Sequence, residues 1–307
     1  VTLEMGISDF EEMHRLAKVS RPDVCVITNI GTCHLENLGD RDGVFKAKTE
    51  MFDYASKDCF VVLNGDDDKL SNVKEVNGHA PVFFGIDTDR DVMAIKYESL
   101  GIRGTKVKIK YFDNEIDKIE KISKGDLIDL RAVIPIPGYH MIYNAMAAVC
   151  IGSHFGMTLD EIDSGIRNLK AIGGRNNIFT TNGITVIDDC YNANPMSMKA
   201  SINVLSQANG RKVAILGDMF ELGENSKELH KEVGQAAVGK VDILVCIGNL
   251  SKDIAEAAIE GGCNTLYFPN KADFEENLSA YIKEGDTVLI KASNGMKFKT
   301  IVEKLKG

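Results

Sequence analysis

The chain has 307 residues, of which 44% are hydrophobic and 26% charged, as in an ordinary soluble globular protein. Its net charge of −9 disfavours a surface for nucleic acid or for an anionic membrane, so we expect no nucleic-acid partner. No apolar run approaches the roughly 18 residues of a membrane span, and no charged, apolar leader opens the chain. We therefore expect no membrane insertion and a cytoplasmic location. The seven cysteines contain no Cys-x-x-Cys pair, which disfavours a zinc site or a disulfide framework.

The first part of the chain predicts a mostly parallel sheet followed by antiparallel strands. Continuous apolar runs at 23–30 and 59–64 are typical of strands buried on both faces of a parallel sheet. Helical spacing at 9–19 and 43–55 supplies the connections. From about 92 to 135 apolar and polar residues alternate, which predicts antiparallel strands with one face in water. Turn signals within that stretch are Asp113-Asn114 and Lys124-Gly125-Asp126.

Two helices follow, at about 140–155 and 158–169. The second begins with a capping box, in which Thr158 caps the helix and Glu161 stands three residues later. Gly173-Gly174 then marks a hinge, at which we place the domain boundary. The predicted domains are 1–173 and 174–307.

After the hairpin signal Asn182-Gly183, strands and helices alternate regularly, which predicts a doubly wound, largely parallel sheet. The predicted strands are 184–188, 212–217, 242–247, 264–268 and 286–291. The predicted helices are 196–208, 226–239, 251–261, 271–283 and 296–305.

Three residues of the first domain are candidates for a metal site, each with a plainer alternative. Glu4 closes a predicted strand at 1–4 and is either a ligand for Mg²⁺ or a surface residue at a strand end. Nothing precedes that strand to support it, so we expect a piece of a longer protein. His34 follows a glycine turn and suits a metal or phosphate contact as well as a single backbone hydrogen bond. Lys48 is a solvated helical lysine by default, and a reactive one if it is desolvated beside a metal.

The loop after the strand 184–188 is rich in polar groups. Asp188 and Asp189 suit a metal, a ribose or no ligand at all. Tyr191, Asn192 and Asn194 add neutral donors and acceptors, and Asn194 stands before a proline that suits the first turn of a helix. This combination fits a small polar ligand better than a protein surface.

Other polar groups are expected near the same sheet edge, because ligands bind at the carboxyl ends of parallel strands. Loops at 217–219 and 291–295, the latter with Ser293, end two further strands. Arg175, at the hinge, suits a phosphate or an interdomain ion pair equally. The sequence contains no Gly-x-Gly-x-x-Gly after a strand, no Gly-x-Ser-x-Gly, no His-Glu-x-x-His and no Walker A loop.

Taken together, these loops resemble the Mur ligase family. The similar stretches keep the family's order over essentially the whole chain, and they lie at 4–6, 29–36, 47–50, 138–145, 189–195 and 217–223. The last two, Asp-Cys-Tyr-Asn-Ala-Asn-Pro and Gly-Asp-Met-Phe-Glu-Leu-Gly, are the most specific. They look like those of the members that add D-alanyl-D-alanine to UDP-N-acetylmuramoyl-tripeptide, since sister ligases carry other residues there.

The resemblance implies an α/β fold with a central, mostly parallel-sheet ATPase-type domain, incomplete at its amino end, and a Rossmann-like carboxy-terminal domain. Glu4 and His34 match residues that serve a magnesium ion in the family, together with a carbamylated lysine that Lys48 matches. Carbamylation turns an amine into an oxygen ligand for a hard cation.

The resemblance also implies an ATP site. Asn144 matches the adenine-contacting asparagine, Arg175 the phosphate-contacting arginine and Asp189 the ribose-contacting carboxylate. Tyr191, Asn192, Asn194 and Ser293 are then expected to bind substrate, and Lys48, His34 and Arg175 to be catalytic. The family's reaction is ATP-driven amide formation through an acyl phosphate, and we expect a monomer.

Three departures from the family pattern stand out. The family's phosphate-binding glycine loop should lie before Glu4, so we expect the 307-residue chain alone to be inactive. Met141 replaces a usual asparagine, and Asn294 replaces a frequent arginine. The alternatives to this ligase are a sister ligase acting on another amino acid or on folate, and a non-catalytic nucleotide-binding or peptide-binding module.

Overall fold

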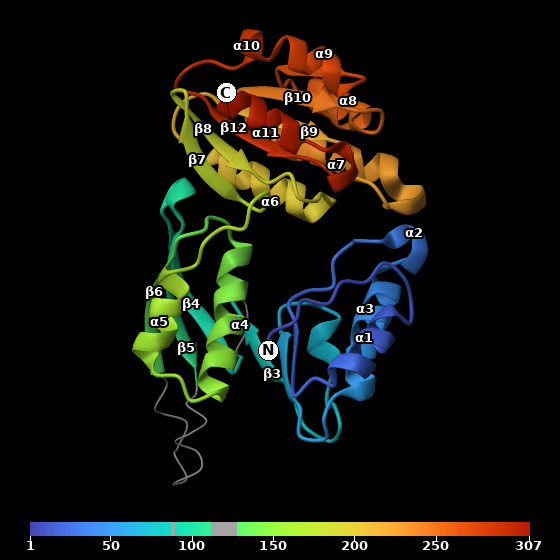
Figure 1. The fold of residues 1–307 in the computed structure, drawn as a ribbon, viewed down its shortest axis with the longest axis vertical. Helices are drawn as coiled ribbons and strands as arrows, with labels where there is room; N and C mark the ends of the chain where they lie inside the picture. Colours follow the sequence, from blue (N-terminus) through green and yellow to red (C-terminus); the bar gives the residue numbers. More distant parts are fainter. Residues whose placement is uncertain (87–89, 112–127) are drawn as a thin grey trace. The chain divides into compact units, whose positions relative to one another are not determined.

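The computed structural model describes residues 1–86, 90–111 and 128–307, which form two compact units (Figure 1). The predicted turns at 113–114 and 124–126 lie outside the described residues. Unit 1 comprises Val1–Leu100, Gly104–Pro135 and Tyr139–Leu169, and unit 2 comprises Gly101–Arg103, Ile136–Gly138 and Lys170–Gly307. The predicted boundary after Gly173 therefore falls inside unit 2.

Unit 1 is built on one sheet whose strands follow the chain order. The strands are β1 (Val24–Ile27), β2 (Phe60–Asn64), β3 (Val82–Gly85), β4 (Val92–Ser99), β5 (Thr105–Tyr111) and β6 (Ile128–Ile134). The strands β1 to β4 are parallel, and β4, β5 and β6 pair antiparallel. The change from parallel to antiparallel pairing is confirmed, but both kinds of strand share one sheet. Within unit 1, only β3 lacks a sequence prediction, because the apolar run 82–84 is shorter than the runs at 23–30 and 59–64 that predict β1 and β2.

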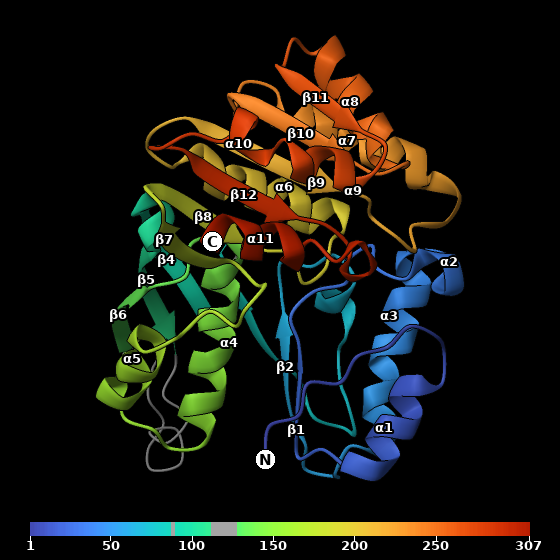
Figure 2. The ribbon, with the colours of Figure 1, turned by 45° about the horizontal axis from the view of Figure 1, so that its top comes forward.

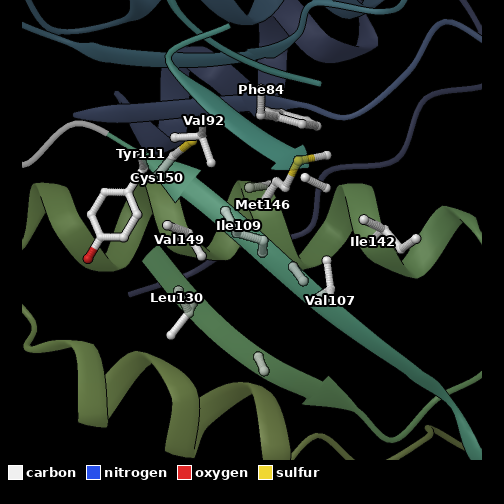
Figure 3. Packing of buried hydrophobic residues seen from close by; sticks show 14 of the residues in the cluster. Phe84, Val92, Val107, Ile109, Tyr111, Leu130, Ile142, Met146, Val149 and Cys150 are labelled. Atoms are coloured by element: carbon white, nitrogen blue, oxygen red, sulfur yellow. The ribbon is translucent and has the colours of Figure 1, made fainter. Parts of the chain in front are cut away.

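Helices cover both faces of this sheet. They are α1 (Glu12–Ser20), α2 (Leu35–Leu38), α3 (Arg41–Thr49), α4 (His140–His154) and α5 (Leu159–Arg167). Successive residues of β2 point to opposite faces, as in any strand. Val62 joins the core formed with α4 and α5, whereas Val61 and Leu63 join the core formed with α1 and α3. Figure 3 shows the first of these cores, where Ile142, Met146 and Val149 of α4 lie against the strands.

The predicted strand at 1–4 is wrong. Residues 1 to 4 have no strand structure and are exposed, with Val1 and Leu3 facing solvent. A strand needs a neighbour to take its backbone hydrogen bonds, and no described strand pairs with this segment. The apolar residues at 1 and 3 therefore mimic a strand pattern without forming one.

Unit 2 contains the doubly wound sheet that the sequence predicts. Its strands are β7 (Asn177–Thr181), β8 (Ile184–Asp188), β9 (Lys212–Gly217), β10 (Ile243–Ile247), β11 (Thr265–Phe268) and β12 (Thr287–Lys291). They lie in the order β11-β10-β9-β12-β8-β7, and Figure 2 shows β12 between β9 and β8. All pairs are parallel except β7 with β8, which the predicted hairpin at Asn182-Gly183 joins.

Two cores lie on the two faces of this second sheet. The helices are α6 (Pro195–Ser206), α7 (Ser226–Ala237), α8 (Ser251–Glu260), α9 (Lys271–Glu276), α10 (Leu278–Tyr281) and α11 (Lys299–Lys306). Ile187 and Leu289 pack with α6, α7 and α8, whereas Val186 and Val288 pack with α9 and α11. The single helix predicted at 271–283 is two helices, since the chain leaves helical geometry at Asn277, where φ is −115° and ψ is 15°.

This strand order brings three loops to one edge of the sheet. The strands β8, β12 and β9 are parallel neighbours, so the loops that follow their carboxyl ends lie side by side. Those loops contain the residues that the sequence singles out at 189–194, 291–295 and 217–223. Among the described residues, no helix is both long and apolar enough to cross a membrane.

Candidate functional site

In unit 1, Lys48 of α3 reaches the loop that follows β1. Its Nζ donates a hydrogen bond to the backbone oxygen of Asn29 at 2.8 Å. Burial lowers the pKa of the Lys48 ammonium below its ordinary value, and the nearby Cys33 and Asp67 only partly oppose that shift. Lys48 is therefore not the solvated helical lysine of the default interpretation. Its lowered pKa raises the fraction of neutral, nucleophilic amine.

The same loop is held by a carboxylate from the end of β2. The side chain of Asp67 is 7% exposed, and its Oδ2 accepts the N–H of Ile30 at 2.8 Å. Arg41 donates from Nε to the carbonyl oxygen of Ile30 at 3.1 Å, and its guanidinium forms a bidentate pair with Asp68. Both backbone groups of Ile30 are thus fixed by charged side chains. Charge-assisted hydrogen bonds of this kind hold a loop in one conformation.

The other two metal candidates, Glu4 and His34, lie outside the regular strands. His34 precedes α2 with a left-handed φ of 55°, and Glu4 is exposed in the segment ahead of β1. Among the described residues, no group of three or more His, Cys, Asp and Glu side chains is arranged to hold a metal ion. A set made of Glu4, His34 and a modified Lys48 has only two such side chains, so the magnesium site stays a prediction.

The predicted adenine contact lies on α4. Asn144 is exposed on this helix, and its Nδ2 approaches the Sδ of Met141 at 3.5 Å. Met141, one of the departures from the family pattern, therefore lies directly beside Asn144. A thioether is a weak acceptor, so this contact leaves the amide available for a stronger partner.

In unit 2, Asp189 is the most heavily bonded candidate. Its Oδ1 accepts the N–H of Asn176 at 2.9 Å, and its Oδ2 accepts the hydroxyl of Ser201 and the ammonium of Lys291, both at 2.6 Å. The side chains of Lys291 and Asp189 are 3% and 14% exposed. Of about four acceptor positions on a carboxylate, these contacts leave one, on Oδ1.

Asp188 ties the predicted hinge to the same loop. Its Oδ2 accepts the N–H of Gly174 at 3.2 Å, and the carbonyl of Gly174 accepts the N–H of Tyr191 at 2.8 Å. Gly174 has a φ of +76°, which an L side chain rarely adopts, and a Cβ there would lie 3.3 Å from Tyr191. Gly174 is therefore part of the unit 2 site.

We call the loop of residues 189–194 the β8 elbow. Some of its polar side chains are hydrogen-bonded within the fold, and others are exposed. The guanidinium of Arg175 lies 4.2 Å from the ring centroid of Tyr191, which is 49% exposed. Asn192 is exposed, and its Oδ1 accepts the N–H of Ala193. Asn194 caps α6 by accepting the N–H of Ser197 at 2.8 Å, which confirms the predicted cap. Arg175, Tyr191 and Asn192 are the exposed residues of this group.

The other two loops are joined to each other. Ser293 is buried, its Oγ accepts the N–H of Phe220 at 2.9 Å, and its own N–H donates to the carbonyl of Asp218. His230 of α7 is fully buried, accepts the N–H of Met219 at Nε2 and donates from Nδ1 to the carbonyl of Ser226 at 2.7 Å. The loop at 217–223 is therefore held on both sides.

The buried imidazole predicts a pH dependence of stability. Burial lowers the pKa of His230 below its ordinary value of 6.5. As the pH falls below about 6.5, the unfolded chain takes up a proton that the folded chain refuses, so the free energy of unfolding decreases. We expect urea unfolding to show this loss between pH 7.5 and 5.5, and His230→Gln, which keeps a donor and an acceptor, to lack it. An equal loss in the variant would contradict this assignment.

The sequence analysis missed four supporting residues: Arg41, Asp67, Ser201 and His230. It placed Lys291 in the loop 291–295 but gave it no role, although a charged residue directly after the apolar run 288–290 is a usable signal. The four missed residues are ordinary polar residues in helices or turns. Their roles depend on which strands become neighbours, and local sequence pattern does not determine strand order.

Comparisons with known proteins identify two matching domain families along the chain. Residues 1–152 match the Mur ligase middle domain, and residues 174–294 match the Mur ligase glutamate ligase domain. The UDP-N-acetylmuramoyl-tripeptide--D-alanyl-D-alanine ligase of Bacillus subtilis is 33% identical over 309 residues, which cover 99% of this chain and 63% of that protein. The enzyme of the same name from Escherichia coli is 30% identical and is covered to 64%.

Solved structures give the same result. A crystal structure of MurF from Acinetobacter baumannii superposes with a TM-score of 0.83 at 29% identity, covering 99% of this chain and 64% of that one. MurF ligase from Thermotoga maritima, solved in complex with ADP, gives a TM-score of 0.80 at 27% identity, covering 99% of this chain and 66% of that one. The chain thus spans just under two thirds of the length of these relatives. Since both domain families match in order and the fold agrees over nearly every residue, the chain belongs to the Mur ligase family.

Proposed function

We propose that this chain is the central and carboxy-terminal part of an ATP-dependent ligase that joins D-alanyl-D-alanine to UDP-N-acetylmuramoyl-tripeptide, a precursor of peptidoglycan. The names of the Bacillus subtilis and Escherichia coli relatives support this substrate pair. Because the chain spans 63% of the first of these, the activity is assigned to the product of the complete gene. We also propose a cytoplasmic location, where ATP is available to the reaction.

The observation that carries the proposal is the β8 elbow. It presents exposed Tyr191 and Asn192 beside the cation of Arg175, at the carboxyl end of a parallel sheet. The aromatic ring of Tyr191 and the amide of Asn192 suit a small polar ligand such as a dipeptide. We assign Tyr191, Asn192, Asn194 and Ser293 to the substrate side, with Asn194 and Ser293 acting through the loop conformations that they fix.

We assign ATP to Asn144, Arg175 and Asp189. The exposed amide of Asn144 suits a purine edge, the remaining acceptor position on Asp189 Oδ1 suits a ribose hydroxyl, and the guanidinium of Arg175 suits a phosphate. The Thermotoga maritima relative was solved in complex with ADP, which supports the use of an adenine nucleotide by the complete protein.

We assign Mg²⁺ to Glu4, His34 and Lys48, with Lys48 carbamylated. The observation that favours this modification is the lowered pKa of the Lys48 amine, because only a neutral amine can attack carbon dioxide. The carbamate would offer oxygen ligands, which this cation prefers. When bound, Mg²⁺ would neutralise charge on the phosphates of ATP.

In the proposed reaction the tripeptide carboxylate attacks the γ-phosphorus of ATP, which forms an acyl phosphate and releases ADP. The amine of the dipeptide then attacks the acyl carbon, and phosphate leaves as the amide forms. The residues of this chain contribute position and charge: Arg175 offsets the developing negative charge, and the β8 elbow orients the amine.

The choice of acceptor tests this proposal against the sister ligases. We expect the product of the complete gene, given UDP-N-acetylmuramoyl-tripeptide and ATP, to yield a mass-spectrometric product with D-alanyl-D-alanine and none with single amino acids such as D-glutamate. Product formation with a single amino acid, and none with the dipeptide, would move the chain to a sister ligase of the same family.

A further inference from the structure

Lys291 is a buried cation that no sequence motif assigns. It is the last residue of β12, and its side chain is 3% exposed. Its Nζ donates to Asp189 Oδ2 at 2.6 Å, to the carbonyl oxygen of Asn192 at 3.0 Å and to the carbonyl oxygen of Asp189 at 3.4 Å. An ammonium has three donors, and all three point to the β8 elbow.

Lys291 does more than form an ion pair, because it also bonds to backbone carbonyls. A pair that served stability alone would need one carboxylate, and buried pairs add little stability compared with apolar side chains of similar size. Lys291 also holds two backbone carbonyls of the elbow. Fixing the carbonyl of Asn192 fixes the peptide plane between Asn192 and Ala193, and with it the exit direction of the Asn192 side chain.

The neighbouring loop supports the same interpretation. Ser293, two residues after Lys291, accepts the N–H of Phe220, so the short segment 291–293 contacts both flanking loops. A displacement of the β8 elbow would therefore break bonds to a rigid strand end. Sites held by side chains on strands are more precise than sites on unsupported loops.

We propose that Lys291 is a positioning residue that sets the conformation of the β8 elbow and thereby the affinity of the ligand that the elbow binds. Lys291 itself does not touch the ligand. The proposal has two parts: a structural arm, that Lys291 orders the elbow, and an affinity arm, that this order sets ligand affinity. Only the affinity arm rests on the proposed function.

Two variants and one control test the structural arm in the 307-residue chain. The control is Arg211→Met, because Arg211 and Asp286 form a second ion pair in unit 2, beside the opposite ends of β9 and β12. We expect Lys291→Met to raise amide hydrogen exchange in residues 189–194 at least about tenfold, and Arg211→Met to leave those amides at wild-type rates. Wild-type exchange in a folded Lys291→Met chain, or an equal rise in the control, would overturn the proposal.

A double variant covers the case in which Lys291→Met fails to fold. Lys291→Met leaves the Asp189 carboxylate without its cation, and the added Asp189→Asn removes that unpaired charge. We expect the double variant to fold and still to exchange rapidly at 189–194, because the bond to the Asn192 carbonyl is absent. Slow, wild-type exchange there would assign Lys291 to charge balance alone and overturn the proposal.

The affinity arm uses the product of the complete gene. We expect Lys291→Met to raise the Michaelis constant for D-alanyl-D-alanine about tenfold or more while Arg211→Met leaves it unchanged, since small misplacements of binding groups cost large factors. An unchanged constant in a variant with a disordered elbow would overturn this arm. If the wild type ligates nothing while Lys291→Met still raises amide hydrogen exchange at residues 189–194, the proposed function fails and the positioning role stands.

Discussion

Replacing Lys48 by alanine is expected to lower the turnover of the ligation reaction by about 10²–10³-fold, the range seen when one charge-stabilising group is removed from an active site. Lys48 is desolvated and directed to the loop of Asn29, so its replacement removes the amine that we propose becomes an oxygen ligand. Bicarbonate or a short carboxylic acid is expected to restore part of the activity, since either supplies the missing oxygens. Steady-state phosphate release measures both effects.

Lys46 offers a matched control on the same helix. It lies two residues away and is exposed, and the described interaction of its ammonium is with the ring of Phe10, 5.5 Å from the ring centroid. Lys46→Ala removes the same number of atoms and the same charge from α3, and we expect wild-type turnover. Wild-type turnover in Lys48→Ala as well would remove Lys48 from the active site and with it the carbamate.

Replacing Asp189 by alanine is expected to raise the Michaelis constant for ATP more than it lowers turnover, because the lost group is assigned to the ribose. The structure adds a second expected effect. The change leaves Lys291 buried without its carboxylate, so the free energy of unfolding should fall by about 3–5 kcal/mol. Urea unfolding measures the second effect and an ATP titration of the reaction rate measures the first.

Asp286→Ala separates these two effects. It breaks the ion pair with Arg211 in the same unit and is also expected to destabilise the chain, but Asp286 lies away from the carboxyl ends of the strands. We expect its Michaelis constant for ATP to remain that of the wild type. A rise equal to that of Asp189→Ala would mean that destabilisation alone accounts for the effect, and Asp189 would leave the nucleotide site.

Most of the fold could be predicted because its elements have a strong period or clear end signals. The strands 184–188 and 212–217 agree residue for residue with β8 and β9, and the caps at Thr158 and Asn194 form as expected. The errors occur where local pattern and long-range pairing disagree. Residues 1 to 4 have the composition of a strand but no described neighbour, whereas β3 has neighbours but only a three-residue apolar run, 82–84.

The sequence predicted the exposed candidate residues of the site but not the buried contacts that hold them. Glycine turns and polar residues after apolar strands pointed to the β8 elbow and to the loop of His34, and the resemblance to the Mur ligases supplied their expected roles. The sequence could not predict that Asp189 would be held by Lys291, 102 positions away, or that Asp67 would fix Ile30. Such contacts depend on strand order, which side-chain pattern alone does not determine.

The most direct test is phosphate release from ATP by the product of the complete gene, given UDP-N-acetylmuramoyl-tripeptide with and without D-alanyl-D-alanine. The acyl phosphate is consumed by attack of the dipeptide amine, so repeated turnover should require the dipeptide. We therefore predict sustained phosphate release with both substrates and little with the tripeptide alone. No release by a folded protein with both substrates present would contradict the ligase and favour a nucleotide-binding or peptide-binding module on the same scaffold.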